Sequence, residues 1–198
     1  QLYTGSGRLF VRRSGRPGGP PLLLLHGWAV HGGMYQGIRA RLERDFELLV
    51  PDLRGHGYSS TPAGAHRWEI ADYASDLVSV LDQLELPRVH VAGYSMGGFV
   101  AIALAQQAPE RVERLAVMCS AARHPPKTQR DLILAEAAFK LLPPSSMAHL
   151  AKRLLAGPGV PDDLRRVMAW LVGYNTRGGI SGAARAMRRT DLREGLAA

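Results

Sequence analysis

The amino-acid sequence predicts an α/β fold with a mostly parallel sheet and helices on both of its faces. Between residues 20 and 119, short apolar runs alternate with segments of helical spacing. The apolar runs lack in-and-out alternation, which is typical of strands buried on both faces of a parallel sheet. Residues 120–198 contain helical patterns and no β-branched run. The repeated alternation indicates crossover helices, and the change near residue 120 indicates a helical subdomain.

The expected elements follow in chain order. Glycine-punctuated residues before position 20 indicate one or two short strands with turns. Four strands are expected at Leu22–Leu25, Phe46–Val50, Val89–Ala92 and Val112–Cys119, the first of them buried on both faces. Helices are expected over residues 34–44, 69–84, 99–108, 128–142, 145–156, 161–173 and 180–197. In the helix over 69–84, the spacing places Asp72 and Asp76 on the polar side.

Composition excludes several classes of protein. The chain has 198 residues, of which 46% are hydrophobic, so it can bury the core of a single domain. One cysteine excludes an internal disulfide framework and a multi-cysteine zinc site. No apolar run approaches the roughly 18 residues that a membrane-spanning helix needs, and the N-terminal residues lack the layout of a signal peptide. We therefore expect a soluble, cytoplasmic protein without membrane contacts.

The formal net charge of +8 is unevenly distributed. Residues 1–119 hold 12 arginines and 11 acidic residues, whereas residues 120–198 hold 13 lysines and arginines against 6 acidic residues. Two interpretations remain open: Arg123, Arg130 or other cations steer an anionic substrate, or the segment has a solvated basic surface, which we favour. Nucleic-acid binding is not expected, because the cations are not interleaved with aromatic residues.

The strongest chemical signal is the G-x-S-x-G motif at Gly93–Gly97. It lies between a predicted strand and a predicted helix, which is the context of a nucleophile elbow. Such a turn has strained backbone angles and close neighbours, so glycines are needed beside the serine. The helix N-terminus that follows favours negative charge. We therefore take Ser95 as the candidate nucleophile; the alternative is a tight turn whose serine only caps the helix.

A second signal, His26-Gly27-Trp28, follows an earlier buried strand. Ligands of open parallel sheets bind at such strand ends. The backbone N–H groups of Trp28 and Met96 are therefore the candidate oxyanion-hole donors. His26 is a candidate pocket residue, although we favour a buried histidine that holds the loop by hydrogen bonds.

A third signal, Asp52–Ser59, has the composition of a structural loop. Asp52 can cap the turn after its strand, and Arg54 can pair with Asp52 or with backbone carbonyls. His56 lies between two glycines in this loop and is not expected to be catalytic.

The chain resembles the α/β-hydrolase superfamily over residues 8–119. Four motifs carry the resemblance: Leu22–Trp28 (LLLLHGW), Pro51–Ser59 (PDLRGHGYS), Val91–Gly98 (VAGYSMGG) and Pro109–Leu115 (PERVERL). Within the superfamily it is most similar to small bacterial hydrolases of the 3-oxoadipate enol-lactonase and haloperoxidase type. The tracts Cys119–Arg123 and Thr190–Arg193 resemble the lactonase branch, and the elbow is also similar to that of the menaquinone-pathway lyase of this fold.

The resemblance implies a serine hydrolase that needs no metal or cofactor. Ser95 would attack an ester, thioester or lactone carbonyl of a small-molecule substrate, and water would release the acyl-enzyme. Residues 1–119 would form the N-terminal part of the core, residues 120–185 a helical cap, and residues 186–198 a return towards the core. Tyr94, Arg123 and Trp170 complete the candidate pocket with His26. A lyase or a perhydrolase of the same fold is the alternative.

The triad acid and histidine cannot be identified in the sequence. In this superfamily they follow the nucleophile, on loops after two further strands, and no pattern for those strands is found here. His124 and His149 are the histidines after Ser95. We expect the acid and base to come from a complementing segment or a partner subunit, which would also cover the apolar edge of the strand Val112–Cys119. A non-catalytic fragment or an interaction subunit is the alternative.

Overall fold

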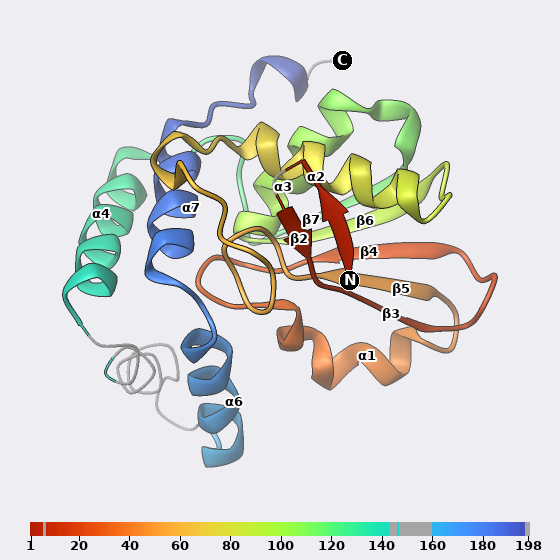
Figure 1. The fold of residues 1–198 in the computed structure, drawn as a ribbon, viewed down its shortest axis with the longest axis horizontal. Coiled ribbons are helices and arrows are strands. Elements are labelled where there is room, and N and C mark those ends of the chain that lie inside the picture. Colours follow the sequence, from red (N-terminus) through yellow and green to blue (C-terminus); the bar gives the residue numbers. More distant parts are fainter. Residues whose placement is uncertain (6, 143–145, 147–159, 197–198) are drawn as a thin grey trace.

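A computed structural model describes residues 1–5, 7–142, 146 and 160–196. Among these residues, five strands form the main sheet in the order β3-β5-β4-β6-β7, as Figure 1 shows. Their bounds are β3 Val11–Gly15, β4 Pro21–Leu25, β5 Glu47–Pro51, β6 Val89–Tyr94 and β7 Val112–Met118. All neighbours are parallel except β3, which runs antiparallel to β5. The four predicted strands and the mostly parallel sheet are therefore confirmed.

The residues before position 20 form more strands than the sequence predicted. A separate hairpin joins β1, Leu2–Thr4, to β2, Gly7–Leu9. The strand β3 then pairs along β5 from Val11↔Pro51 to Gly15↔Glu47. An antiparallel edge strand can expose one face to water, so β3 carries the charged residues Arg12 and Arg13, which a buried parallel strand could not.

Helices cover both faces of the sheet. The helices α2, Ile70–Gln83, and α3, Met96–Gln107, lie together on one face, and α1, Gln36–Leu42, lies on the other. Short 3₁₀ turns occupy Gly32–Tyr35, Ala65–Arg67, Pro109–Arg111 and Glu194–Leu196. The main apolar core packs β4, β5 and β6 against α2 and α3. A second cluster around Leu24, Tyr35 and Leu48 fills the α1 side.

One detail of α2 corrects the sequence analysis. The helical spacing placed Asp76 on the polar side, but Asp76 is 4% exposed. Its carboxylate accepts a 2.6 Å hydrogen bond from Nε of Arg54, which is itself largely buried. A buried ion pair and a solvated face give the same helical pattern, so the spacing alone cannot distinguish them.

The strand β7 is an open edge of the sheet. It pairs with β6 on one side and has no strand on the other among the described residues. Its side chains are largely exposed, including Leu115 at 41%, Val117 at 40% and Met118 at 39%. Adjacent β-strand residues point to opposite faces, so β7 exposes apolar side chains on both faces.

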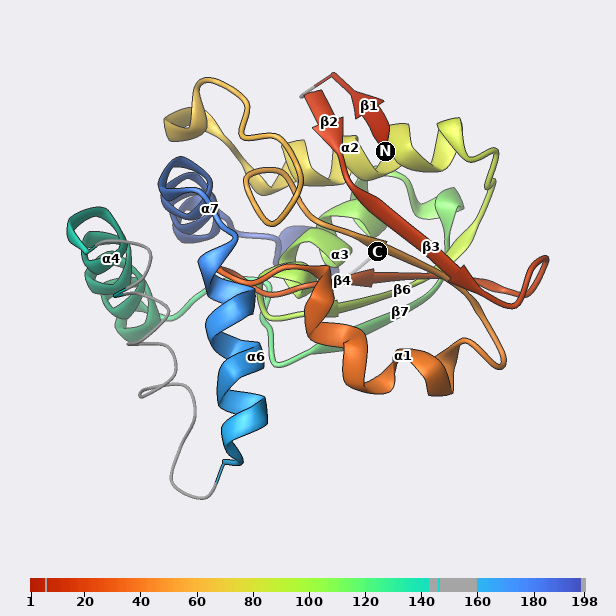
Figure 2. The same ribbon diagram turned by 60° about the horizontal axis from the view of Figure 1, so that its bottom comes forward.

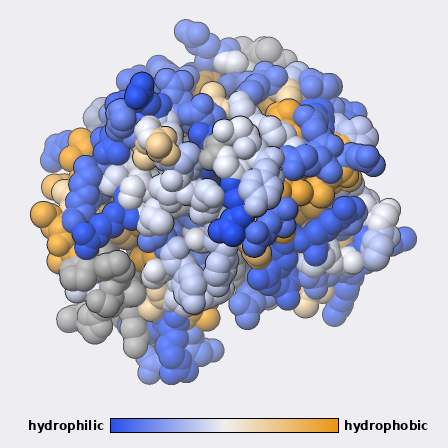
Figure 3. Space-filling view, in the orientation of Figure 1, coloured by the Kyte–Doolittle hydropathy of each residue, from blue (hydrophilic) through white to orange (hydrophobic). Residues whose placement is uncertain are grey.

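The helices after β7 lie beyond one end of the sheet, as Figures 1 and 2 show. They are α4 Pro126–Leu141, α6 Asp162–Gly173 and α7 Arg177–Arg189. The carboxylate of Glu136 on α4 accepts 2.6 Å hydrogen bonds from Arg185 and Arg188 on α7. Figure 3 shows apolar surface on the outer side of α4, where Ile133, Leu134 and Leu141 are exposed. The helix expected over 145–156 falls outside the described residues.

The helix α7 differs from the sequence prediction in its end and in its packing. It ends at Arg189, whereas the Ala- and Arg-rich pattern predicted a helix to residue 197. Ala183, Ala186 and Met187 belong to the main core. The expected cap boundary at residue 185 therefore falls inside a continuous helix that packs on the core. In the part of the chain that the structure describes, no helix is long and apolar enough to cross a membrane.

Candidate active site

Ser95 occupies a strained turn between β6 and α3. Its backbone has φ 52° and ψ −115°, a left-handed φ that residues other than glycine rarely adopt. Two hydrogen bonds hold the turn: the Ser95 N–H donates to the Met118 carbonyl at 2.9 Å, and the Gly98 N–H donates to the Ser95 carbonyl at 2.9 Å. The neighbouring strand β7 thus helps to fix the serine at the first turn of α3.

The glycines on either side of Ser95 allow close backbone approach. A Cβ on Gly93 would overlap the backbone of Gly97, and a Cβ on Gly97 would overlap the carbonyl oxygen of Leu25. A side chain at either position would therefore push the elbow away from β4. This close approach is the reason for glycine that the sequence analysis gave.

The His26-Gly27-Trp28 segment lies directly beside the elbow. Leu25, the last residue of β4, is paired with Gly93 of β6. A Cβ on Gly27 would lie 3.2 Å from the Tyr94 ring and 3.5 Å from Cβ of Ser95. The two signals that the sequence analysis singled out, 67 residues apart along the chain, are therefore brought together.

Two backbone donors at this junction are unused. In the residues that the structure describes, neither the Trp28 N–H nor the Met96 N–H donates a hydrogen bond. Met96 is the first residue of α3, where the N–H has no intrahelical acceptor and the helix dipole favours negative charge. Two free N–H groups beside a serine can stabilise an oxyanion that forms there.

His26, a candidate pocket residue, lines neither of the two cavities described below. The side chain is completely buried. Its Nδ1–H donates to the Gly27 carbonyl at 2.8 Å, and its Nε2 accepts from the Leu53 N–H at 2.9 Å. These contacts are those of a histidine that holds the loop. Burial lowers the pKa of His26 to about 4, so its imidazole is neutral at pH 7.

His56 is also buried and structural, as the sequence analysis expected. Its Nδ1–H donates to the Arg54 carbonyl at 3.0 Å, and its ring lies 5.2 Å from that of His26. Burial, together with the neighbouring imidazole of His26, lowers the pKa of His56 to about 3.

Asp52 and Arg54 stabilise the same loop, but not by pairing with each other. The Asp52 carboxylate accepts hydrogen bonds from the N–H groups of Gly32 at 2.8 Å and Tyr58 at 2.9 Å. It therefore caps the turn after β5. The Arg54 guanidinium donates to the Asp72 backbone carbonyl at 2.7 Å, which is one of the two partners expected for it, and it pairs with Asp76 at 2.6 Å. It does not pair with Asp52, the other expected partner.

The other three candidate pocket residues, Tyr94, Arg123 and Trp170, do not lie together. Tyr94 is 38% exposed and lies beside Gly27. Arg123 is on the surface, with Nε 3.7 Å from the carboxylate of Asp191. The Trp170 ring is 4.4 Å from that of His31 and lines a small cavity of about 50 Å³. Neither Ser95, Trp28 nor Met96 lines this cavity.

Contacts of the Trp28 side chain were not foreseen. Its Nε1–H donates to the Ile180 carbonyl of α7 at 2.9 Å, and its ring packs edge-on against Phe139 of α4 at 5.3 Å. Both partners are more than 100 residues away in sequence. No local pattern could have indicated them, apart from the helical spacing that made α4 and α7 amphipathic elements.

The described residues give Ser95 no general base. Ser95 Oγ makes no hydrogen bond within them. The ring of His124 packs against Phe99 at 4.6 Å, with Nε2 buried and without a partner among the described groups. His149 lies outside the described residues.

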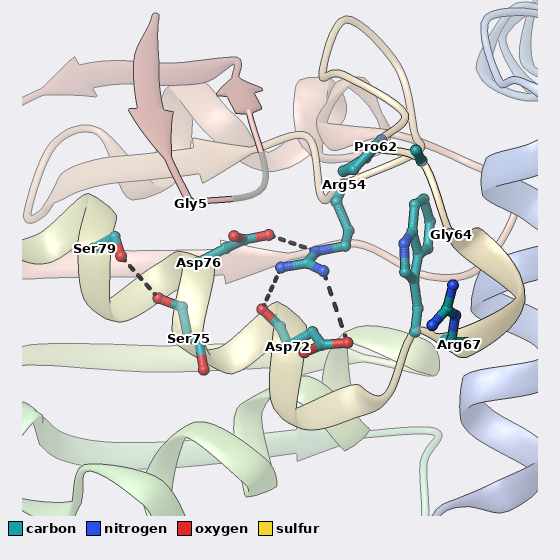
Figure 4. Close-up of a pocket in the computed structure, with 11 residues that line it drawn as sticks. Gly5, Arg54, Pro62, Gly64, Arg67, Asp72, Ser75, Asp76 and Ser79 are labelled. Atoms are coloured by element: carbon teal, nitrogen blue, oxygen red, sulfur yellow. Dashed lines mark hydrogen bonds and ion pairs between the residues drawn. The ribbon is translucent and has the colours of Figure 1, made fainter.

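A separate cavity, drawn in Figure 4, is lined by none of Ser95, Trp28 and Met96. It has a volume of about 630 Å³ and lies between the β1–β2 hairpin, the loop around Gly64 and helix α2. Its charged walls are already paired: Arg54 bonds Asp76 and the Asp72 backbone, while Nε of Arg67 donates to His66. The cavity thus contains none of the candidate catalytic groups.

Comparison with known proteins shows which family the chain belongs to. The family model described as alpha/beta hydrolase fold matches residues 20–176. The AB hydrolase superfamily protein YisY of Bacillus subtilis is 32% identical over 205 residues, which cover 96% of this chain and 73% of that protein. The pimeloyl-[acyl-carrier protein] methyl ester esterase of Nitrosospira multiformis is 39% identical over 111 residues, which cover 56% of this chain and 41% of the esterase. The match thus spans less than half the length of that esterase.

Solved structures of hydrolases superimpose on this chain and support the same family. A hydrolase from Pseudomonas aeruginosa PA01 superimposes with a TM-score of 0.83 at 31% identity, over 98% of this chain and 73% of that one. The enol-lactonase from Burkholderia xenovorans LB400 superimposes with a TM-score of 0.80 at 24% identity, over 94% of this chain and 72% of that one, which is a likeness of fold. The parallel sheet, the elbow and these matches together lead to one conclusion. The chain belongs to the α/β hydrolase fold family.

Proposed function

We propose that the chain carries the nucleophile and oxyanion hole of a serine hydrolase that acts on a carboxylic ester, a thioester or a lactone. One observation carries the proposal. Ser95 is held at φ 52° directly beside Gly27, and the adjoining N–H groups of Trp28 and Met96 donate to no other described residue. Backbone strain of this kind costs about 1–3 kcal/mol and persists where the surrounding structure demands it.

The proposed reaction begins with attack of Ser95 Oγ on the carbonyl carbon. The carbonyl oxygen becomes an oxyanion, which the N–H groups of Trp28 and Met96 stabilise. The base that the complementing segment is proposed below to supply takes the Ser95 hydroxyl proton during the attack. Collapse of this intermediate breaks the bond to the alcohol or thiol, which receives that proton from the base, and leaves an acyl group on Ser95. Water then attacks the acyl-enzyme, and the acid product leaves. Loss of one oxyanion-hole donor typically lowers the rate about 10²- to 10³-fold.

Esters are the substrate class that we favour. The Nitrosospira multiformis relative is named as an esterase of a pimeloyl methyl ester, and the same nucleophile and donors would serve thioesters and lactones. Arg123 pairs with Asp191 on the surface, so its contact gives no specific support to an anionic substrate. The basic cap is therefore best taken as a solvated surface.

We further propose that a complementing polypeptide segment pairs with the free edge of β7 and supplies the acid and the base. An unpaired strand edge with exposed apolar side chains is prone to pair with another strand. Leu115 and Val117 expose 41% and 40% of their surface there. The competing function is a non-catalytic interaction subunit, which the absence of a base beside Ser95 in the described residues favours.

A fluorophosphonate probe tests the hydrolase proposal. The complete gene product should be labelled at Ser95, and the Ser95→Ala variant should not. Intact mass spectrometry of the purified material, with a search for a second polypeptide, tests the complementing segment. Absence of labelling, or equal labelling of the variant, would refute the hydrolase. A single species of 21.5 kDa with measurable esterase turnover would refute both the complementing segment and the interaction subunit.

A further inference from the structure

We propose that His26 is a positioning residue that sets the orientation of the Gly27–Trp28 peptide and thereby aims the Trp28 N–H at the substrate oxyanion. This inference rests on the proposed function. It assigns to a completely buried histidine a specific effect on the chemistry at Ser95, beyond holding the loop together.

The argument starts from the geometry of the peptide group. In a trans peptide the C=O of one residue and the N–H of the next lie in one plane and point in opposite directions. The described chain contains no cis peptide bond. The Gly27 carbonyl is held by Nδ1–H of His26 at 2.8 Å. The N–H of Trp28 must therefore point away from His26, on the side of the peptide that the histidine leaves open.

The hydrogen bonds of His26 also fix its tautomer. The Leu53 N–H can only donate, so Nε2, 2.9 Å away, must carry a lone pair. The Gly27 carbonyl can only accept, so Nδ1 must carry the proton. The ring thus accepts a hydrogen bond from the loop after β5 and donates one to the Gly27–Trp28 peptide. Burial of the ring, and to a lesser degree the imidazole of His31, lower the pKa of His26 and so disfavour a second proton.

The flanking residues are fixed by other contacts, which leaves the orientation of this peptide to His26. The Trp28 indole donates to the Ile180 carbonyl at 2.9 Å. The Ala29 carbonyl accepts from Nδ2 of Asn175 at 2.8 Å, and Ala29 has a φ of 60°. Gly27, without a side chain, offers little resistance to rotation of the peptide plane. Removal of the Nδ1–H donor would therefore release the Gly27 carbonyl, for which the described residues provide no other hydrogen-bond donor.

Two substitutions separate positioning from loop tethering. In His26→Asn, the side-chain NH₂ can take the place of Nδ1–H and keep the bond to the Gly27 carbonyl. In His26→Gln, the side-chain oxygen can take the place of Nε2 and keep the bond from the Leu53 N–H, but the donor to Gly27 is lost. Both variants remove a ring from the core, so both should be destabilised to a similar degree.

The rate of Ser95 labelling by a fluorophosphonate is the first readout, measured on the complete gene product with Ser95→Ala as the blank. The maximal labelling rate of His26→Gln should fall about 10²- to 10³-fold, as for loss of one oxyanion donor. His26→Asn should stay within about tenfold of the wild type, and the half-saturating probe concentration should change little in either variant. Equal losses in the two variants, or no loss in His26→Gln, would overturn the proposal.

Nitrogen-15 NMR of the histidine rings is the second readout, and it does not depend on activity. At pH 7, His26 should show a protonated Nδ1 and a bare Nε2. The Trp28 amide and Gly27 carbonyl resonances should shift in His26→Gln and remain near their wild-type positions in His26→Asn. A proton on Nε2 would overturn the positioning role even if Ser95 is labelled. The expected spectra without wild-type labelling would instead refute the hydrolase and leave the peptide orientation established.

Discussion

Acid should unfold this protein well above the pH at which carboxylates titrate. The buried imidazoles of His26 and His56 have pKa values lowered to about 4 and about 3. In the unfolded chain both groups titrate near pH 6.5. As the pH falls below 6.5, these two imidazoles become protonated in the unfolded state but stay neutral in the folded state. The free energy of unfolding therefore decreases progressively.

The magnitude follows from the two shifts. Between pH 6 and pH 4.5, the unfolded chain binds up to two more protons at these sites, which gives a slope of up to about 2.7 kcal/mol per pH unit. When the pH is lowered from 7.5 to 5, each of these two histidines should lower the free energy of unfolding by about 2 kcal/mol, and both together by about 4 kcal/mol. That loss is comparable with the total stability of many domains, which is about 5–15 kcal/mol. Asp191, with a pKa of about 2, responds only at lower pH.

Urea unfolding of the wild type and of His56→Asn between pH 5 and pH 8 measures this effect. The asparagine keeps a donor for the Arg54 carbonyl, which His56 now bonds at 3.0 Å, but it cannot be protonated. The variant should lose up to about 1.4 kcal/mol per pH unit of slope, which is the contribution of one buried histidine. A wild-type stability that is flat from pH 7.5 to pH 5 would refute the reasoning.

Two further substitutions test the packing around the site. Gly97→Ala places a methyl group against the carbonyl oxygen of Leu25, so thermal unfolding should show a loss of about 1–3 kcal/mol; Gly173→Ala, where nothing lies within 4 Å, should be neutral or slightly stabilising. Glu136→Gln breaks the bond network that ties α4 to α7, so hydrogen exchange of α4 should accelerate about tenfold or more, whereas Asp162→Asn, with an 83% exposed side chain, should not change it. An intact melting temperature in Gly97→Ala, or unchanged exchange in Glu136→Gln, would contradict these assignments.

The strands and the elbow could be predicted because their signals are local. A run such as Leu22–Leu25 reports its own burial, and Gly93–Gly97 contains both the serine and the glycines that its turn requires. The pairing of Arg54 with Asp76 could not be predicted, because 22 residues separate the two and a buried carboxylate has the same helical spacing as a solvated one.

The end of the last predicted helix was misjudged for a different physical reason. Ala- and Arg-rich sequence has high helix propensity, so it predicted a helix to residue 197. Tertiary contacts override propensity: the helix stops at Arg189, and the Leu192 N–H then donates to the Ala122 carbonyl at 2.9 Å. The same contacts place Ala183 and Met187 in the core, which no cap boundary drawn from composition could show.

The proposed oxyanion hole is held by the sheet core and by the helices that follow β7. The Gly27 carbonyl is held by a core histidine, while the Trp28 indole and the Ala29 carbonyl are held by Ile180 and by Asn175, which follows α6. Movement of α7 or of the segment after α6 must therefore disturb the segment that presents the Trp28 N–H.

This arrangement separates two contributions to the proposed catalysis. In serine hydrolases, loss of any triad member leaves a residual rate of about 10³–10⁴ over water, which the oxyanion hole and substrate binding provide. The strain at Ser95, the free Met96 N–H and the peptide held by His26 all come from described residues, and none of them depends on a general base. The electrostatic part of the site can thus be preorganised in this chain, whereas activation of the nucleophile depends on the group that reaches Ser95 Oγ.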